Sequence, residues 1–186
     1  MGGALPRGDR LCLAPMDLES AEVHSRWALW MADAEVARQY GGKSRPITID
    51  EARETVTGLK GHRFALIRIE FGDWIGCGSV HDVDPVNRNA FIGLFVGDAA
   101  NRGKGYGGEA VRLLLEFAFG ELGLNCVALS VRADNAPAIA CYRKAGFRDA
   151  GRRREWIAEG EGYVDRLYMD ILSREFRALW GGAEGD

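Results

Sequence analysis

A glycine-rich loop lies between two apolar segments, and this order constrains the fold more than any other feature of the chain. Residues 90–98 read AFIGLFVGD, which predicts a buried strand, and residues 109–122 read EAVRLLLEFAFGEL, which predicts a helix that is apolar nearly all round. Between them, residues 101–108 read NRGKGYGG. A further buried strand is predicted at residues 126–131, so the segment indicates one βαβ crossover.

The rest of the chain predicts more strands than helices. Alternating polar and apolar residues predict a short strand at 10–14, strands at 63–70 and 74–83, and two last strands at about 147–158 and 163–172. One helix is predicted after an N-cap at Asp17, a second around residues 33–40, a third after the capping box Thr48–Glu51, and a fourth after an N-cap at Asp134 that ends at Gly146. We therefore expect an α+β (mixed α/β) fold in one domain, residues 10–175, with terminal tails at 1–9 and 176–186.

Bulk composition excludes several classes of function. The net charge of −3 gives no reason to expect nucleic-acid binding, and no apolar run approaches the ~20 residues of a membrane span. The four cysteines show neither C-x-x-C spacing nor a Cys/His cluster, so we expect no metal site and reduced thiols. These features predict a cytoplasmic protein.

The glycine loop admits several interpretations. A Walker A loop fails, because Lys104 is followed by glycine and no hydroxyl stands ready for Mg²⁺. Residues 103–108 spell G-x-G-x-x-G, the fingerprint of NAD(P) sites, but that fingerprint needs an acid about 20 positions further on, where Asp134 comes late and is expected to cap a helix. A connector without a ligand is the remaining structural interpretation.

A frame that starts one residue earlier, at Arg102, gives R-x-x-G-x-G over residues 102–107. Residues 131–147 then read VRADNAPAIACYRKAGF, with Asn135 and Tyr142 seven positions apart on one helical face. Both segments resemble the GNAT acetyltransferases, and the resemblance extends over about residues 10–172. Within that family the chain looks most like the branch of ribosomal-protein N-terminal acetyltransferases and spermidine acetyltransferase.

The resemblance implies a central, mostly antiparallel mixed sheet that is splayed between strands 90–98 and 126–131 and flanked by helices. It also implies acetyl transfer from acetyl-CoA to an amine by direct attack, with a homodimer compatible with the family. Tyr142 would protonate or hydrogen-bond the leaving thiolate. The residues implied to bind the cofactor are Leu94, Phe95 and Val96 on the first strand, Arg102, Gly103, Lys104, Gly105, Tyr106, Gly107 and Gly108 in the loop, and Asn135 and Ala138 on the following helix.

The general base and the acceptor are left open by the sequence. Candidates for the base by residue type are Glu35, His81, Asp82 and Asp84, although a lone histidine such as His81 is more often structural. Trp27, Trp30, Tyr40 and Trp156 are candidates for an acceptor pocket, and Asp33 and Glu35 for attracting a cationic amine. A catalytically silent CoA-binding module and an NAD(P)-binding enzyme remain as alternatives.

Overall fold

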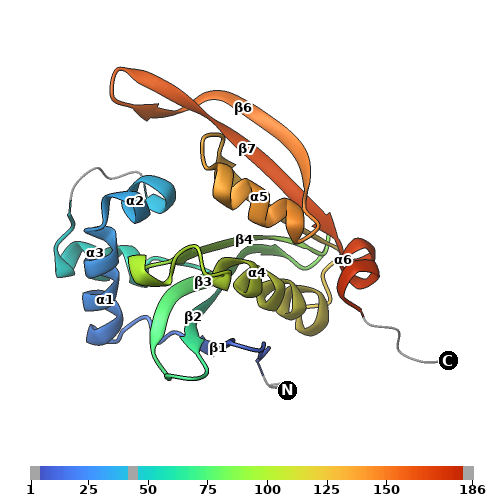
Figure 1. The fold of residues 1–186 in the computed structure, drawn as a ribbon, viewed down its shortest axis with the longest axis horizontal. Coiled ribbons are helices and arrows are strands. Elements are labelled where there is room, and N and C mark those ends of the chain that lie inside the picture. The colour runs from blue at the N-terminus through green and yellow to red at the C-terminus, as the bar shows by residue number, and fades with distance from the viewer. Residues whose placement is uncertain (1–4, 42–45, 182–186) are drawn as a thin grey trace.

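The computed structural model describes residues 5–41 and 46–181, and seven strands in it form a single sheet (Figure 1). The order across the sheet is β1-β2-β3-β4-β5-β7-β6. The strands are β1 (Leu11–Pro15), β2 (His62–Arg68), β3 (Trp74–Asp84), β4 (Asn89–Val96), β5 (Cys126–Arg132), β6 (Arg148–Glu159) and β7 (Gly162–Leu172). All neighbours pair antiparallel except β4 and β5, which are parallel. This confirms the α+β fold and contradicts a doubly wound dinucleotide-binding sheet.

Helices cover both faces of the sheet (Figure 1). The helices are α1 (Ala21–Met31), α2 (Ala34–Val36), α3 (Ile49–Thr57), α4 (Tyr106–Glu116), α5 (Ala136–Lys144) and α6 (Ser173–Trp180), with a 3₁₀ turn η2 (Ala99–Asn101) and π-helical turns η1 (Ala37–Gly41) and η3 (Phe117–Glu121). The α4 helix packs on β1, β3 and β4, while α1, α2 and α3 gather on the other side.

Two apolar cores result from this arrangement. The larger core lies around α4, where Leu113, Leu114 and Leu115 are fully buried, as expected for a helix that is apolar on most of its surface. The smaller core joins α1 and α3 to the opposite face of β3 and β4, through Trp27 and Phe95 among others. Successive residues of a strand point to opposite faces, so β4 contributes to both cores.

The helix starts test the predicted caps. The capping box at Thr48 is confirmed, since its hydroxyl accepts from Glu51 N at 3.2 Å and the Glu51 carboxylate accepts from Thr48 N at 2.9 Å. The cap at Asp17 is wrong: α1 begins at Ala21, and the Asp17 side chain instead accepts from Glu19 N in the preceding turn. Gly146 ends α5 with a φ of 102°, as its position predicted.

The predicted cap at Asp134 is also wrong. Asn135 caps α5, because its side-chain oxygen accepts from Ala138 N at 3.2 Å. Asp134 is drawn to two arginines instead, Arg132 at 2.9 Å and Arg38 at 2.5 Å. Adjacent Asp and Asn are equally good caps, and the ion pairs decide between them.

The C-terminal helix continues past residue 175, the predicted end of the domain. Phe176 is 8% exposed and belongs to the larger core, so α6 is part of the folded unit up to Trp180.

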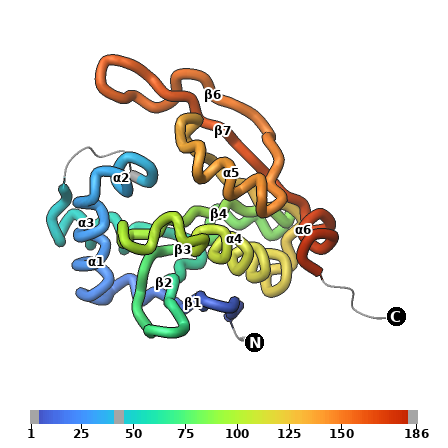
Figure 2. The backbone as a smooth tube through the Cα atoms, viewed as in Figure 1, coloured from blue at the N-terminus to red at the C-terminus, as the bar shows by residue number. Residues whose placement is uncertain are grey.

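The β6–β7 hairpin extends away from the rest of the sheet, as the tube in Figure 2 shows. β6 is the outermost strand and is exposed over almost its whole length. Its pairing with β7 shifts register between Arg153 and Ile157, where Glu155 adopts a φ of 51°. Three arginines, Arg152 to Arg154, precede this irregularity.

Candidate active site

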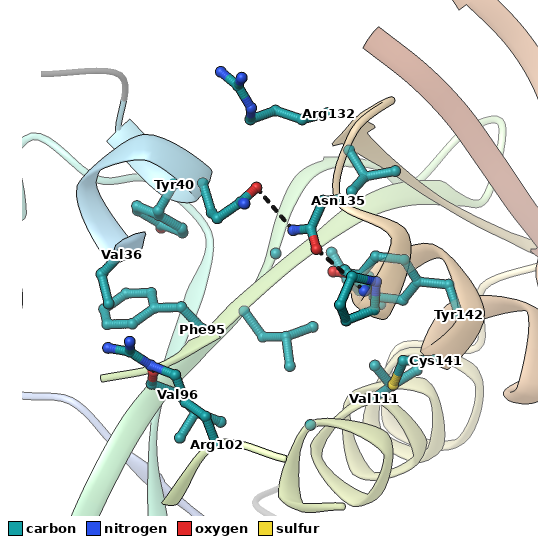
Figure 3. A pocket seen from close by; sticks show the side chains of 18 of the residues that line it. Val36, Tyr40, Phe95, Val96, Arg102, Val111, Arg132, Asn135, Cys141 and Tyr142 are labelled. Atoms are coloured by element: carbon teal, nitrogen blue, oxygen red, sulfur yellow. Dashed lines mark hydrogen bonds between the residues drawn. The ribbon is translucent and has the colours of Figure 1, made fainter. Parts of the chain in front are cut away.

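The sheet opens between β4 and β5. The parallel pairing covers only three positions, from Asn89 opposite Cys126 to Phe91 opposite Ala128, although β4 runs on to Val96 and β5 to Arg132. A cavity of about 670 Å³ lies in the gap, and Figure 3 shows side chains from both strands and the surrounding helices around it. The splayed sheet implied by the resemblance is therefore present.

The cavity passes from one face of the sheet to the other. Phe91, Gly93 and Phe95 line it from one face of β4, and Ile92 and Leu94 line it from the other. One mouth therefore opens beside the glycine loop, α4 and α5. The other opens beneath α2 and η1, beside β3 and β7.

The glycine loop forms the wall of the first mouth. Gly103 and Gly105 have φ of 70° and 85°, in the left-handed region where other residues are strained. A Cβ on Gly107 would meet no atom within 4 Å, so the backbone at the start of α4 can be approached closely. Helix N-termini present unpaired N–H groups and partial positive charge, and α4 begins here. The loop therefore fits a pyrophosphate.

Arg102 turns away from this cradle. Its guanidinium donates to the Asp33 carboxylate at 2.9 Å, to Glu35 at 3.0 Å, and to the carbonyls of Val96 and Gly97 at 3.1 and 2.6 Å. The guanidinium in turn holds the pKa of Asp33 below its usual range, mainly through their hydrogen bond. These contacts tie α2 to the end of β4, which gives Arg102 a positioning role in addition to any contact with a ligand.

Arg102 lines the cavity, whereas the two other side chains of the loop do not. Lys104 is exposed, and its carbonyl accepts from Arg10 at 2.9 Å. The Tyr106 ring lies 4.8 Å from the Arg10 guanidinium. Neither residue is among those that line the cavity, so the side chains predicted to bind the cofactor at these two positions point elsewhere.

The free edge of β4 forms one wall of the slot. Gly97 N donates to Ile75 on β3 at 2.8 Å, and the main-chain groups of a strand alternate between its two edges. The N–H and C=O of Phe95 therefore also point to β3, whereas those of Leu94 and Val96 point to the slot. The Phe95 side chain is 8% exposed and packs in the smaller core. Of the three residues, Leu94 offers the slot its N–H and C=O, and Val96 offers its N–H, because the Val96 carbonyl accepts from Arg102.

The α5 helix forms the opposite wall. Asn135, Ala138, Cys141 and Tyr142 line the cavity together, which confirms that Asn135 and Tyr142 share one face of the helix. The Asn135 amide also donates to the Gln39 side chain at 2.8 Å across the cavity (Figure 3). Burial raises the pKa of the Tyr142 hydroxyl well above its usual range, so this group stays protonated.

The second mouth separates the candidates for the base. His81 and Glu35 line the cavity, whereas Asp82 and Asp84 do not. The Asp84 carboxylate accepts from Val86 N and Asn87 N in a turn. Glu35 is paired with Arg102. His81 lies beside Gly93 of β4, and burial together with the Arg63 charge lowers its pKa, so its imidazole is neutral near pH 7.

The aromatic candidates for the acceptor pocket are divided by the fold. Tyr40 lines the cavity, whereas Trp27 and Trp30 are each 2% exposed in the smaller core. Trp156 lies on the exposed β6 strand, 4.4 Å from the Arg153 guanidinium, and does not line the cavity. Arg63, Arg132 and Arg166 also line the cavity. Their place there could not be predicted from the local sequence, because arginine is equally common on exposed strands.

Residues 5–41 and 46–181 contain no group of three or more His, Cys, Asp or Glu side chains suited to a metal ion, and no helix there has the length and apolar character needed to cross a membrane. The four cysteines are free thiols. Burial raises the pKa of Cys77 and of Cys141, so both remain protonated near neutral pH.

A slot between diverging strands, with a phosphate cradle at one mouth and the unpaired edge of a strand along its wall, defines an acyltransferase that takes an extended acyl donor. Residues 10–148 match the family model described as the acetyltransferase (GNAT) domain. The chain belongs to this family. It is an acetyltransferase, and its acyl donor is acetyl-CoA.

Two relatives and one solved structure illustrate the similarity. The chain is 30% identical to "Uncharacterized N-acetyltransferase p20" of Bacillus licheniformis, over 90% of this chain and 96% of that protein. It is 29% identical to "Putative ribosomal N-acetyltransferase YdaF" of Bacillus subtilis (strain 168), over 88% and 86% respectively. The fold matches spermidine N-acetyltransferase from Vibrio cholerae, solved with CoA and spermine, with a TM-score of 0.79 at 19% identity over 90% of this chain and 98% of that one.

Proposed function

We propose that the protein transfers the acetyl group of acetyl-CoA to a primary amine, by direct attack of the amine within a ternary complex. The observation that carries this proposal is the cavity that runs through the splayed sheet. The acyl donor would enter beside the glycine loop and the amine would enter beneath η1. The two reactants then meet at Gly93 and Leu94, where the sheet is open.

His81 is the candidate base. An amine attacks only with its lone pair free, so a proton must leave the nitrogen as the N–C bond forms. The lowered pKa keeps the His81 imidazole able to accept that proton near pH 7. Its Nδ1 lies 3.2 Å from the Ser79 hydroxyl, and that hydroxyl is 3.2 Å from the Gly93 carbonyl, which orients the ring. In this role Nε2 accepts the proton.

Tyr142 and the backbone of β4 would stabilise the charge that develops on the donor. The C–S bond breaks as the amide forms, and the sulfur leaves with a negative charge that a protonated hydroxyl can neutralise. Tyr142 keeps its proton because the hydroxyl is buried. The Leu94 N–H points to the slot and is the candidate donor to the thioester oxygen.

A covalent route through the protein is disfavoured. Cys141 is the thiol that lines the cavity among the described residues, and only a thiolate is a strong nucleophile. Burial raises its pKa, so it is a poor candidate for an acetylated intermediate. Direct transfer needs no such intermediate.

One of the relatives and the solved structure are named for acceptors of the same chemical class. One is named for ribosomal N-acetylation, and the other is a spermidine N-acetyltransferase solved with spermine. A protein N-terminus and a polyamine share a primary amine, and this shared group is what we propose for the present chain.

Release of free CoA thiol from acetyl-CoA, followed across a panel of amines and short peptides, tests the proposal. We expect turnover with at least one amine, and initial rates that give intersecting double-reciprocal lines. Parallel lines would contradict direct transfer and point to Cys141. Binding of acetyl-CoA without thiol release on any amine would instead identify a silent CoA-binding module.

A further inference from the structure

Two of the arginines that line the second mouth of the cavity form no ion pair with a carboxylate of residues 5–41 and 46–181. Four charged residues at its rim neutralise one another: Arg38 and Arg132 each pair with Asp134 and with Glu159. Glu35, a fifth charged residue there, is paired with Arg102, which also pairs with Asp33. The pairs of Arg38 and Arg132 hold η1 against the end of β5 and the end of β6.

Arg166 has no such ion-pair partner. It lies on β7 directly opposite Arg132 of β5, and it lines the cavity. Its Nε is buried and has no hydrogen-bond partner, and within residues 5–41 and 46–181 its guanidinium has no carboxylate within 4.0 Å. Leaving a buried donor of a charged group unsatisfied costs free energy, because water that solvated it is removed. A natural partner for such a group is an anion that enters the cavity.

Arg63 supplies a second cation on the opposite flank of the slot. It lies on β2, and its guanidinium donates to the Lys60 carbonyl at 3.0 and 2.6 Å. In the described part of the chain no carboxylate pairs with it. Its charge contributes to the lowered pKa of His81, which shows that the field of Arg63 reaches the candidate base. The mouth thus has one unbalanced arginine, that is, one without a described carboxylate partner, on each side of the path to His81.

We propose that the acceptor is an anionic amine, one whose primary amine is accompanied by a carboxylate or a phosphate that Arg166 binds, with Arg63 adding to the attraction. This inference rests on the proposed acetyl transfer and names its acceptor class. A guanidinium binds both oxyanions through paired N–H donors, so the two sources share one chemistry. A polyamine brings only positive charge to a mouth where two arginines are unbalanced, and like charges disfavour such a partner.

Matched acceptors separate this proposal from its alternatives. We would compare β-alanine with β-alaninamide, phosphoethanolamine with ethanolamine, and both pairs with putrescine, by CoA release. We expect the anionic member of at least one pair to have the higher kcat/KM, by about tenfold or more, since a charge-assisted hydrogen bond discriminates to this degree. A difference between β-alanine and β-alaninamide indicates a carboxylate site, and a difference between phosphoethanolamine and ethanolamine indicates a phosphate site. A preference for the amide, for ethanolamine or for putrescine would overturn the proposal.

Arg166→Gln should remove the preference for the anionic acceptor while leaving kcat/KM for its neutral partner nearly unchanged. Arg63→Gln should reduce the same preference by a smaller factor, and Arg174→Gln on exposed α6 is the matched control. Retention of the full preference in Arg166→Gln would contradict the assignment. An unchanged Kd for acetyl-CoA shows that the variant is folded.

A second measurement does not depend on turnover. With the protein saturated in CoA, succinate or inorganic phosphate should raise Tm, and putrescine should not. Arg166→Gln should lose this stabilisation and Arg174→Gln should keep it. Equal shifts in the two variants would refute an anion site at Arg166. If no amine releases CoA but succinate or phosphate still raises Tm, the proposed acetyl transfer is contradicted and the anion site at Arg166 is supported.

Discussion

Replacing Tyr142 with phenylalanine tests the chemistry of the slot most directly, because it removes one oxygen from a side chain that is otherwise unchanged. The Tyr142 ring packs against Phe147, with their centroids 5.9 Å apart, and phenylalanine keeps that contact. Among the described residues the hydroxyl has no hydrogen-bond partner, so its loss leaves no buried group unsatisfied. We expect the free energy of unfolding to change by less than about 1 kcal/mol.

The effect on catalysis should be much larger. Burial raises the pKa of Tyr142 above 10, so the hydroxyl carries its proton throughout the pH range 6 to 9. Loss of a general acid lowers a rate by about 10² to 10⁴, and we expect kcat to fall by about 10², which corresponds to about 2.7 kcal/mol of barrier. The affinity for acetyl-CoA should stay within about threefold, because the role arises only as the sulfur becomes negative.

The assay is the initial rate of CoA thiol release at saturating acceptor, together with the Kd of acetyl-CoA by calorimetry. Tyr163→Phe is the matched control, since Tyr163 is 65% exposed on β7 and outside the cavity. A kcat within about threefold of the wild type would show that Tyr142 is not the acid. A rise in Kd that accounts for the whole loss of kcat/KM, with kcat unchanged, would show that the hydroxyl only binds the donor.

Three further predictions concern the base, the cradle and the fold. His81→Asn should lower kcat/KM by about 10². Because the pKa of His81 is lowered from its usual 6.5, the wild-type kcat/KM should rise with pH in the range below about 6.5. His81→Asn should lose this rising part of the pH profile. His62→Asn, outside the cavity, should keep it. Gly107→Val should weaken acetyl-CoA binding at least about tenfold, measured by calorimetry, with little change in Tm. The reason is that a Cβ at this position meets no protein atom and enters the space of the ligand. An unchanged Kd would show that the loop does not bind acetyl-CoA. Thr48→Ala should lower the free energy of unfolding by about 1 kcal/mol in urea without changing kcat, and no loss would mean that the capping box contributes nothing to α3.

The strand, loop and helix around the first mouth could be predicted because their signals are local. The glycine loop at residues 103–108, the apolar strand before it and the shared face of Asn135 and Tyr142 can all be inferred from the sequence pattern. The family motifs then favoured R-x-x-G-x-G over G-x-G-x-x-G as the pattern of the loop. These are features in which neighbours along the chain determine the conformation.

The second mouth could not be predicted in this way, because distant segments build it. The family motif implies that Arg102 binds the cofactor, but its ion pairs with Asp33 and Glu35, almost 70 positions earlier, could not be foreseen from the sequence. Arg166 lies on an ordinary alternating strand, and only its register with Arg132 places two cations side by side. Charge balance within a cavity is a property of tertiary structure.

The two edges of the sheet bear on whether the protein stays soluble at high concentration. An outer strand has unpaired N–H and C=O groups that can recruit another chain and seed aggregation. β1 is only five residues long and is in contact with α4. β6 is long and exposed, but three consecutive arginines and the kink at Glu155 would place repelling charges and a twist against any incoming copy. The arginine run at residues 152–154 would thus disfavour self-association through β6.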